Sequence, residues 1–249
     1  MLANKLTLQS SREHVEKNEL KPWQVKSWCI PKLGARFVAK MEDVLTVYQR
    51  AYTPNRPVIC LDEIQKALRS TPRGRIRMKS GAPWREDYEY KRHDKCSLFL
   101  AVEPLAGFRK VWVSQRRTQL DFALVIKELL DDVYPEAEKI ILVVDNLNIH
   151  HPAALYQRFP PAEARRLAAR IEWHYTPEHG SWLNMAECEL SVLRRQSLRA
   201  RVSDIATVRE KAAAWEANRN QRQIGIDWQF TTDDARIKLK RLYPIVNVQ

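Results

Sequence analysis

The stretch ILVVDNLNIHHP, residues 141–152, joins an apolar run to a cluster of polar side chains. Residues 140–144 are uniformly apolar, and the run is too short for a core helix. Such a run is typical of a strand buried on both faces of a sheet that helices cover. In open sheets of this kind, ligands bind beyond the carboxyl ends of the strands. Asp145 follows the run directly, which makes it a candidate functional residue. An aspartate in this place can also simply cap a helix or turn.

The composition limits the classes of protein that fit. The chain has 249 residues, of which 45% are hydrophobic, so it can form one large domain or one domain with appendages. It has neither a GxGxxG nor a Walker-type phosphate-binding loop, and its four cysteines lack metal-site spacing and fit a reducing compartment. No segment reaches transmembrane length, and the first residues lack the apolar block of a signal peptide. We therefore expect a cytoplasmic protein without membrane contact.

The charge points to a polyanionic partner. The formal net charge is +12 and the pI is about 9.7, values that favour nucleic acid. Between Ile64 and Arg85 there is no acidic residue, and basic residues alternate with other residues in part of this window. An alternating basic row on an extended arm can follow a phosphate backbone, although a solvated basic loop would have the same composition. The basic residues of the window are Lys66, Arg69, Arg73, Arg75, Arg77, Lys79 and Arg85.

The order of the expected elements indicates the fold class. Apolar runs predict strands at 58–62, 96–102, 108–113, 140–144 and 172–175. Helical spacing and capping residues predict helices at 10–18, 22–31, 37–48, 118–133, 161–171, 183–199, 203–220 and 231–242. Hairpin-connected strands come first and alternating helices and strands follow, which predicts an α/β fold with a mixed sheet and helices on both faces.

Two acids follow apolar runs of this expected sheet. Asp62 comes after VICL and Asp145 after IILVV, and adjacent central strands would bring the two carboxylates together. Because neighbouring carboxylates repel each other, their closeness requires a cation, and an acidic oxygen site suits Mg²⁺ or Mn²⁺. A third carboxylate could come from the helix after residue 183, which carries Glu187 and Glu189. These two flank its apolar stripe about equally on opposite sides, so helical periodicity does not choose between them.

The motifs VICLDE, REDYEYKRH (85–93), LVVDNLNIH (142–150) and HYTPEHGSWLNMAE (174–187) occur in this order along the chain. In this order they resemble the successive motifs of mariner-related transposases of bacterial insertion sequences. These are DDE transposases with a ribonuclease H-like, integrase-type catalytic fold. The resemblance spans about residues 10–245. It assigns the catalytic, metal-binding acids to Asp62, Asp145 and Glu187, so that the family pattern selects Glu187 over Glu189.

The resemblance also implies cofactors, supporting residues and partners. Two Mg²⁺ ions, or Mn²⁺ in their place, would be held by the three acids, with Asp62 as the bridge. Asn146, Asn148 and His150 could orient Asp145 or contact the DNA backbone. His179, Asn184 and Trp182 also match the family pattern, with Trp182 expected in the core. The residues expected to bind double-stranded DNA are Arg69, Arg73, Arg75, Arg77, Lys79, Arg85, Lys91 and Arg92.

The resemblance implies cut-and-paste movement of an element with terminal inverted repeats, carried out by a homodimer on DNA in the bacterial, nucleoid-associated cytosol. Family members begin with a long helix-turn-helix region, of which only the tail is expected here, in residues 10–23. We therefore predict an N-terminal helical segment at 1–53 and a catalytic domain at 54–245. The alternatives are a hydrolytic ribonuclease H-like nuclease and a non-catalytic DNA-binding remnant that regulates a full-length transposase.

Overall fold

The computed structural model describes residues 34–244, apart from 74, 77–79, 82, 84 and 87, and without the side chains of 75, 76, 85 and 86. The chain divides into two compact units, residues 1–33 and 34–249, and the described residues belong to the second. The two helices predicted before residue 34 lie outside the described residues. No helix in the described part is both long and apolar enough to cross a membrane.

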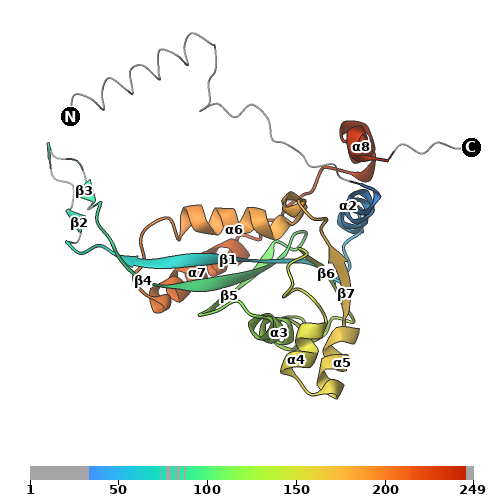
Figure 1. The fold of residues 1–249 in the computed structure, drawn as a ribbon, viewed down its shortest axis with the longest axis horizontal. Coiled ribbons are helices and arrows are strands. Elements are labelled where there is room, and N and C mark those ends of the chain that lie inside the picture. The colour runs from blue at the N-terminus through green and yellow to red at the C-terminus, as the bar shows by residue number, and fades with distance from the viewer. Residues whose placement is uncertain are drawn as a thin grey trace, which may run out of the picture. The chain divides into compact units, whose positions relative to one another are not determined.

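A five-stranded mixed sheet forms the centre of the described unit (Figure 1). Its strand order is β5-β4-β1-β6-β7, with antiparallel pairing among β5, β4 and β1 and parallel pairing among β1, β6 and β7. The strands are β1 (Val58–Ser70), β4 (Lys91–Glu103), β5 (Phe108–Ser114), β6 (Ile140–Val144) and β7 (Ile171–Tyr175). All five residues of β6 are buried, as its uniform apolar sequence predicts.

Helices cover both faces of the sheet. The helices α3 (Gln119–Glu128), α4 (Ala153–Arg158) and α5 (Pro161–Ala169) lie on one face, where Phe122, Leu155 and Leu167 join one buried cluster with Leu61 and Leu142. The helices α6 (Met185–Gln196) and α7 (Ile205–Gln221) lie on the other face (Figure 1). The remaining elements are α2 (Ala35–Tyr48), which lies against β7, a π-helical turn (Leu129–Val133), two 3-10 turns (Ser181–Leu183 and Lys240–Leu242) and α8 (Thr232–Lys238).

β1 and β4 are longer than predicted. Each has 13 residues, whereas the apolar runs end at 62 and begin at 96. Most of the additional residues are polar, and β1 and β4 pair as an antiparallel ribbon as far as Ser70 and Lys91, so backbone bonds hold the strands where no continuous apolar run marks them. The position predicted for Asp62, at the end of a strand, is therefore wrong, because β1 continues through it to Ser70. Beyond the ribbon, the short strands β2 (Arg75–Ile76) and β3 (Arg85–Glu86) pair with each other.

Side chains cap the N-termini of α3, α6, α7 and α8, whereas α2, α4 and α5 begin without a side-chain cap. Thr118 and Thr231 form the capping boxes of α3 and α8 with Asp121 and Asp234. Ser203, the predicted cap of α7, does not cap it; Asp204 accepts the N–H of Thr207 instead. α4 was not predicted, since it has only six residues and follows directly on the polar loop after β6.

Candidate active site

The strand register brings Asp62 and Asp145 to the same level of the sheet. In the parallel ladder of β1 and β6, Cys60 lies opposite Val143. Two residues after this pair in each of the two segments, Asp62 comes level with Asp145. Burial raises the pKa of Asp62 to about 7, helped by the charges of Glu63 and Asp145, although the N–H of Glu63 donates to Asp62 Oδ1 at 2.7 Å. The electrostatic influence of Asp145 indicates that the two carboxylates are near each other.

Asp145 is held by a fully buried histidine. His150 Nδ1 lies 2.6 Å from Asp145 Oδ1, and His150 Nε2 lies 2.9 Å from Glu63 Oε2. Burial alone would lower the pKa of His150, but its bonds to the two carboxylates raise the pKa to about 9. At neutral pH His150 is therefore an imidazolium that donates to both acids. The pKa of Asp145 is lowered, since His150 and the N–H of Leu147 outweigh its burial. The expected supporting role of His150 thus has a direct geometric basis.

Glu63 is a part of the site that sequence reasoning missed. Its side chain is buried, bonds to His150, and pairs with Arg117 Nη1 at 3.1 Å. The alternation of β1 puts Glu63 on the face of Ile59 and Leu61, which belong to the main core cluster. An acidic residue on the same face of a strand as core residues is buried, and a buried carboxylate needs a hydrogen-bonding or charged partner. This alternation was the signal that the sequence offered for Glu63. The partner itself, 87 residues away, leaves no local pattern.

Asn184 connects the start of α6 to β1. It is fully buried, accepts the N–H of Ala186 as the helix cap, and donates from Nδ2 to the carbonyl oxygen of Leu61 at 3.0 Å. Leu61 directly precedes Asp62. The carbonyl of Asn184 accepts the N–H of Glu187 at 3.1 Å. Asn184 therefore fixes the first turn of α6, which carries Glu187, against the strand that carries Asp62.

Glu187 and Glu189 have opposite surroundings. Glu187 is exposed in the first turn of α6. Glu189 is only 4% exposed, and it pairs with Arg109 at 2.9 Å and with Arg219 at 2.6 Å. Since Arg109 is itself completely buried, this ion pair is part of the core. Of the two glutamates, Glu187 has the carboxylate that is available to a ligand.

Comparisons with known proteins agree with this arrangement. A family model described as DDE superfamily endonuclease matches residues 57–209, more than half of the chain and the stretch that contains Asp62, Asp145 and Glu187. The chain belongs to this family. No significant match was found among curated proteins.

The fold of this DDE endonuclease is that of solved transposase structures. The Mos1 mariner paired end complex with Mn is 15% identical with a TM-score of 0.55, and the match covers 97% of this chain and 75% of that one. The Mos1 paired end complex with Mg is 16% identical with a TM-score of 0.51, covering 87% and 66%. The Mos1 Strand Transfer Complex is 13% identical with a TM-score of 0.50, covering 94% and 68%. The predicted ribonuclease H-like α/β fold is confirmed.

The acids of the endonuclease provide some of the ligands that a divalent cation needs, but not a complete set. Asp62 in β1 and Asp145 directly after β6 offer carboxylate oxygens, which suit Mg²⁺. Within the described residues, however, no group of three or more acid, histidine or cysteine side chains lies close enough together to hold a metal ion. Glu187 is tied to the strand of Asp62 through Asn184, but it does not complete a ligand set with the two aspartates.

Other predicted supporting residues lie around this pair. Asn146 accepts from Lys40 Nζ at 2.5 Å and donates to the carbonyl of Thr176, so it ties neighbouring segments together. His179 is exposed, with a positive φ of 63°. Trp182 is not in the core as predicted: it is 43% exposed, with its ring edge on Phe230. Only part of this indole is covered because the 3-10 turn that carries it lies at the surface.

Of the residues expected to bind DNA, those that the structure describes lie at or beyond the far end of the β1–β4 ribbon. Arg69 stacks on Tyr90, Arg73 is exposed with a 3.4 Å ion pair to Glu89, and Lys91 and Arg92 are exposed at the start of β4. Arg75 and Arg85 lie in β2 and β3, but their side chains are not described, and Arg77 and Lys79 lie outside the described residues.

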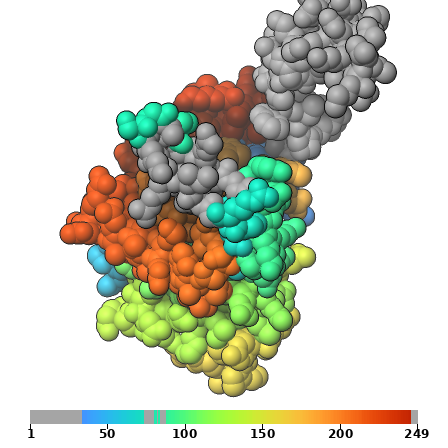
Figure 2. Space-filling model, turned by 90° about the vertical axis from the view of Figure 1, so that its left-hand side faces the viewer, coloured from blue at the N-terminus to red at the C-terminus, as the bar shows by residue number. Residues whose placement is uncertain are grey.

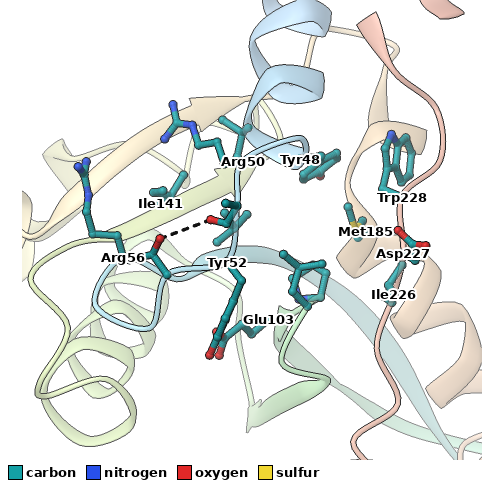
Figure 3. Close-up of a pocket in the computed structure, with 16 residues that line it drawn as sticks. Tyr48, Arg50, Tyr52, Arg56, Glu103, Ile141, Met185, Ile226, Asp227 and Trp228 are labelled. Carbon is teal, nitrogen blue, oxygen red and sulfur yellow. Dashed lines mark hydrogen bonds between the residues drawn. The ribbon is translucent and has the colours of Figure 1, made fainter.

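A separate apolar hollow of about 190 Å³ lies at the start of β1 (Figure 3). Tyr48, Ile141, Met185 and Trp228 line it, and none of the three candidate acids does. Two arginines that line the hollow, Arg50 and Arg56, form ion pairs with Glu172, which lies outside it. The hollow is therefore not part of the candidate active site.

Proposed function

We propose that this DDE endonuclease is the catalytic part of a transposase, which cuts DNA strands at the ends of a mobile element and joins them to target DNA. The observation that carries this function is the placement of Asp62 in β1 and of Asp145 directly after the neighbouring parallel strand β6, with Asp145 bonded to His150, which in turn bonds to Glu63. Support also comes from the fold likeness to transposase complexes named for paired ends and strand transfer.

Asp62, Asp145 and Glu187 would hold Mg²⁺, with Mn²⁺ as a substitute and two ions as the expected number. Bound there, the cations would supply an activated water or 3′-hydroxyl and stabilise the leaving oxygen. The residues of the chain prepare the site. Asp62, whose pKa is raised by burial to about 7, would lose its proton to solvent when a cation binds. His150 keeps Asp145 ionised and oriented, and Asn184 holds the first turn of α6, with Glu187, against β1.

The substrate of this site is double-stranded DNA, which comprises the terminal inverted repeats of the element and its target. The positive net charge of +12 supports this substrate class. Assembly as a homodimer on DNA belongs to the same proposal, as does a division into an N-terminal segment at 1–53 and a catalytic domain at 54–245.

The test uses three single variants, Asp62→Asn, Asp145→Asn and Glu187→Gln, with Glu178→Gln as the matched control on an exposed acid. Each of the three should abolish Mg²⁺-dependent cleavage of supercoiled or pre-nicked element DNA, because the acids act as one unit. Each should also reduce the rise in melting temperature that Mg²⁺ produces in the parent protein. The control should retain both.

Two outcomes separate the alternatives. Cleavage by the parent without joined products, when a 3′-hydroxyl end and target DNA are supplied, would make the protein a hydrolytic nuclease. Cleavage that none of the three variants changes would come from a contaminant, and the role of a regulatory DNA-binding protein would replace catalysis.

A further inference from the structure

A basic groove of about 960 Å³ runs from the candidate active site along β1. β1 pairs with β6 only over Val58–Cys60, so beyond Cys60 this edge of β1 has no partner strand within the described residues. The groove begins at Glu63, next to Asp62, and continues along the open edge to Arg69. There the N–H of Arg69 donates to the carbonyl of Val202, so the segment after α6 closes the far end.

The lining of the groove is strongly positive. Five arginines besides Arg69 line it, against a single acid, Glu63: they are Arg117, Arg194, Arg195, Arg199 and Arg201. Arg117 comes from the segment before α3, and the other four come from the end of α6 and the segment after it. Figure 2 faces this end of the molecule, with the end of α6 and the start of α7 (orange) above the start of α3 (yellow-green).

Several of these cations are uncompensated. Arg194, Arg195 and Arg199 are exposed, and within the described part of the chain none of them has a hydrogen bond or ion pair. Lys66 is partly buried among them and donates to the carbonyls of Leu198 and Ala200 at 2.6 and 3.1 Å, which fixes this segment beside β1. A fixed wall of like charges costs free energy unless an anion occupies the space in front of it.

Aromatic rings lie at the outer end of the groove. The ring of Tyr90 lies between two guanidinium groups, 4.5 Å from that of Arg69 and 5.4 Å from that of Arg201. Tyr90 is nonetheless 47% exposed, and Tyr88 is 82% exposed. A positively charged groove combined with exposed aromatic rings is the usual arrangement for single-stranded nucleic acid, whose phosphates meet the cations and whose bases stack.

We propose that this groove binds a single DNA strand that runs to or from the candidate catalytic acids, an inference that rests on the proposed function. The exposed rings of Tyr88 and Tyr90 favour a single strand, whose bases are free to stack, over a duplex. An extended peptide could pair with the same edge, but the excess of arginine favours phosphate.

The experiment measures binding rather than cleavage, so that it can fail independently of the proposed function. The affinity of the full chain for fluorescent oligothymidine is followed by anisotropy over a range of salt concentrations. The test variant is Arg194→Ala/Arg195→Ala/Arg199→Ala. The control, Lys139→Ala/Arg158→Ala/Arg165→Ala, removes the same charge from residues that do not line the groove, two of them in α4 and α5 on the opposite face (Figure 1).

We expect the test variant to bind oligothymidine at least tenfold more weakly. Its slope of log K against log salt should fall by up to about 2, since each lost phosphate contact removes about 0.7. The control should stay within about twofold of the parent, and Asp62→Asn should bind as the parent does even where it no longer cleaves. An unchanged affinity of the test variant would overturn the proposal. If the test variant lost as much affinity for a duplex hairpin, the single-strand assignment would be overturned. If polyglutamate displaced the fluorescent oligothymidine as effectively as unlabelled oligothymidine does, the groove would be assigned to an acidic peptide.

Discussion

Glu189 is buried against Arg109 and Arg219, whereas Glu187, two residues earlier in α6, is exposed. Glu189→Gln would leave the fully buried Arg109 without its counter-charge. Breaking a buried pair in this way costs about 3–5 kcal/mol. We therefore predict a loss of about 3 kcal/mol in the free energy of unfolding, at the lower end because glutamine still accepts a hydrogen bond. Urea unfolding in EDTA measures it, with Glu187→Gln as the control that should change by less than about 0.5 kcal/mol.

This difference also governs how activity data are interpreted. A Glu189→Gln protein that neither folds well nor cleaves says nothing about metal binding. The sequence could not separate the two glutamates by helical position, and the separation comes from Arg109, which lies 80 residues away in the chain. If Glu189→Gln unfolded like the parent, the buried ion pair would not be part of the core.

Asp62 and Asp145 should respond oppositely to neutralisation. The pKa of Asp62 rises from 3.8 to about 7 on folding, so between these values the folded state keeps a proton that the unfolded chain has lost. Stability then falls as the pH rises from about 4 to 7. Asp62→Asn removes this pH-dependent loss of stability. In EDTA at pH 8, the variant should therefore be more stable than the parent, by at most about 4 kcal/mol, since each pKa unit corresponds to about 1.4 kcal/mol.

The pKa of Asp145 is instead lowered, so its ionised form stabilises the folded state above its unfolded pKa and loses this effect as the pH falls. Asp145→Asn should therefore be less stable than the parent at pH 8, because His150 loses one of its two carboxylates. Thermal unfolding of both variants at pH 5 and pH 8 distinguishes the two aspartates. A shift of the same sign at pH 8 would contradict the surroundings described here.

At the scale of elements, Asn184 sets the position of α6. Asn184→Ala removes a helix cap, at a cost of about 0.5–2 kcal/mol, and leaves the buried carbonyl of Leu61 without its donor. We predict a loss of about 2 kcal/mol and a weaker Mg²⁺-dependent rise in melting temperature, since Glu187 is no longer tied to β1. Asn184→Asp keeps the cap acceptor but cannot donate to Leu61. If Asn184→Asp retained the full Mg²⁺ response, the bond to Leu61 would have no part in positioning Glu187.

The elements that the sequence predicted well are those with a local cause. The β6 strand follows from its apolar run, and α3 and α8 begin at capping boxes that are readable within four residues. The missed features depend on distant partners. The polar half of β1 exists because β4 pairs with it, and α4 exists because Ala154 and Leu155 are buried in the core cluster.

For the whole molecule, the order of elements and the motif series were enough to predict the fold class and the DDE family, both of which the comparisons support. The candidate site was predictable only as a set of acids. The Glu63 and Arg117 ends of its hydrogen-bonded chain are joined by contacts between remote segments, which a single sequence does not reveal.

The charge of the whole molecule leads to the last prediction. Arg73, Arg75 and Arg77 belong to an acid-free segment expected to track the backbone of duplex DNA. Changing all three to alanine should weaken duplex binding and reduce the slope of log K against log salt by up to about 2.7, because each phosphate contact contributes about 0.9. The triple variant of Lys139, Arg158 and Arg165 is again the control. Oligothymidine binding should change less than duplex binding, because Arg73 does not line the basic groove. A duplex slope equal to that of the parent would remove the segment from the DNA interface.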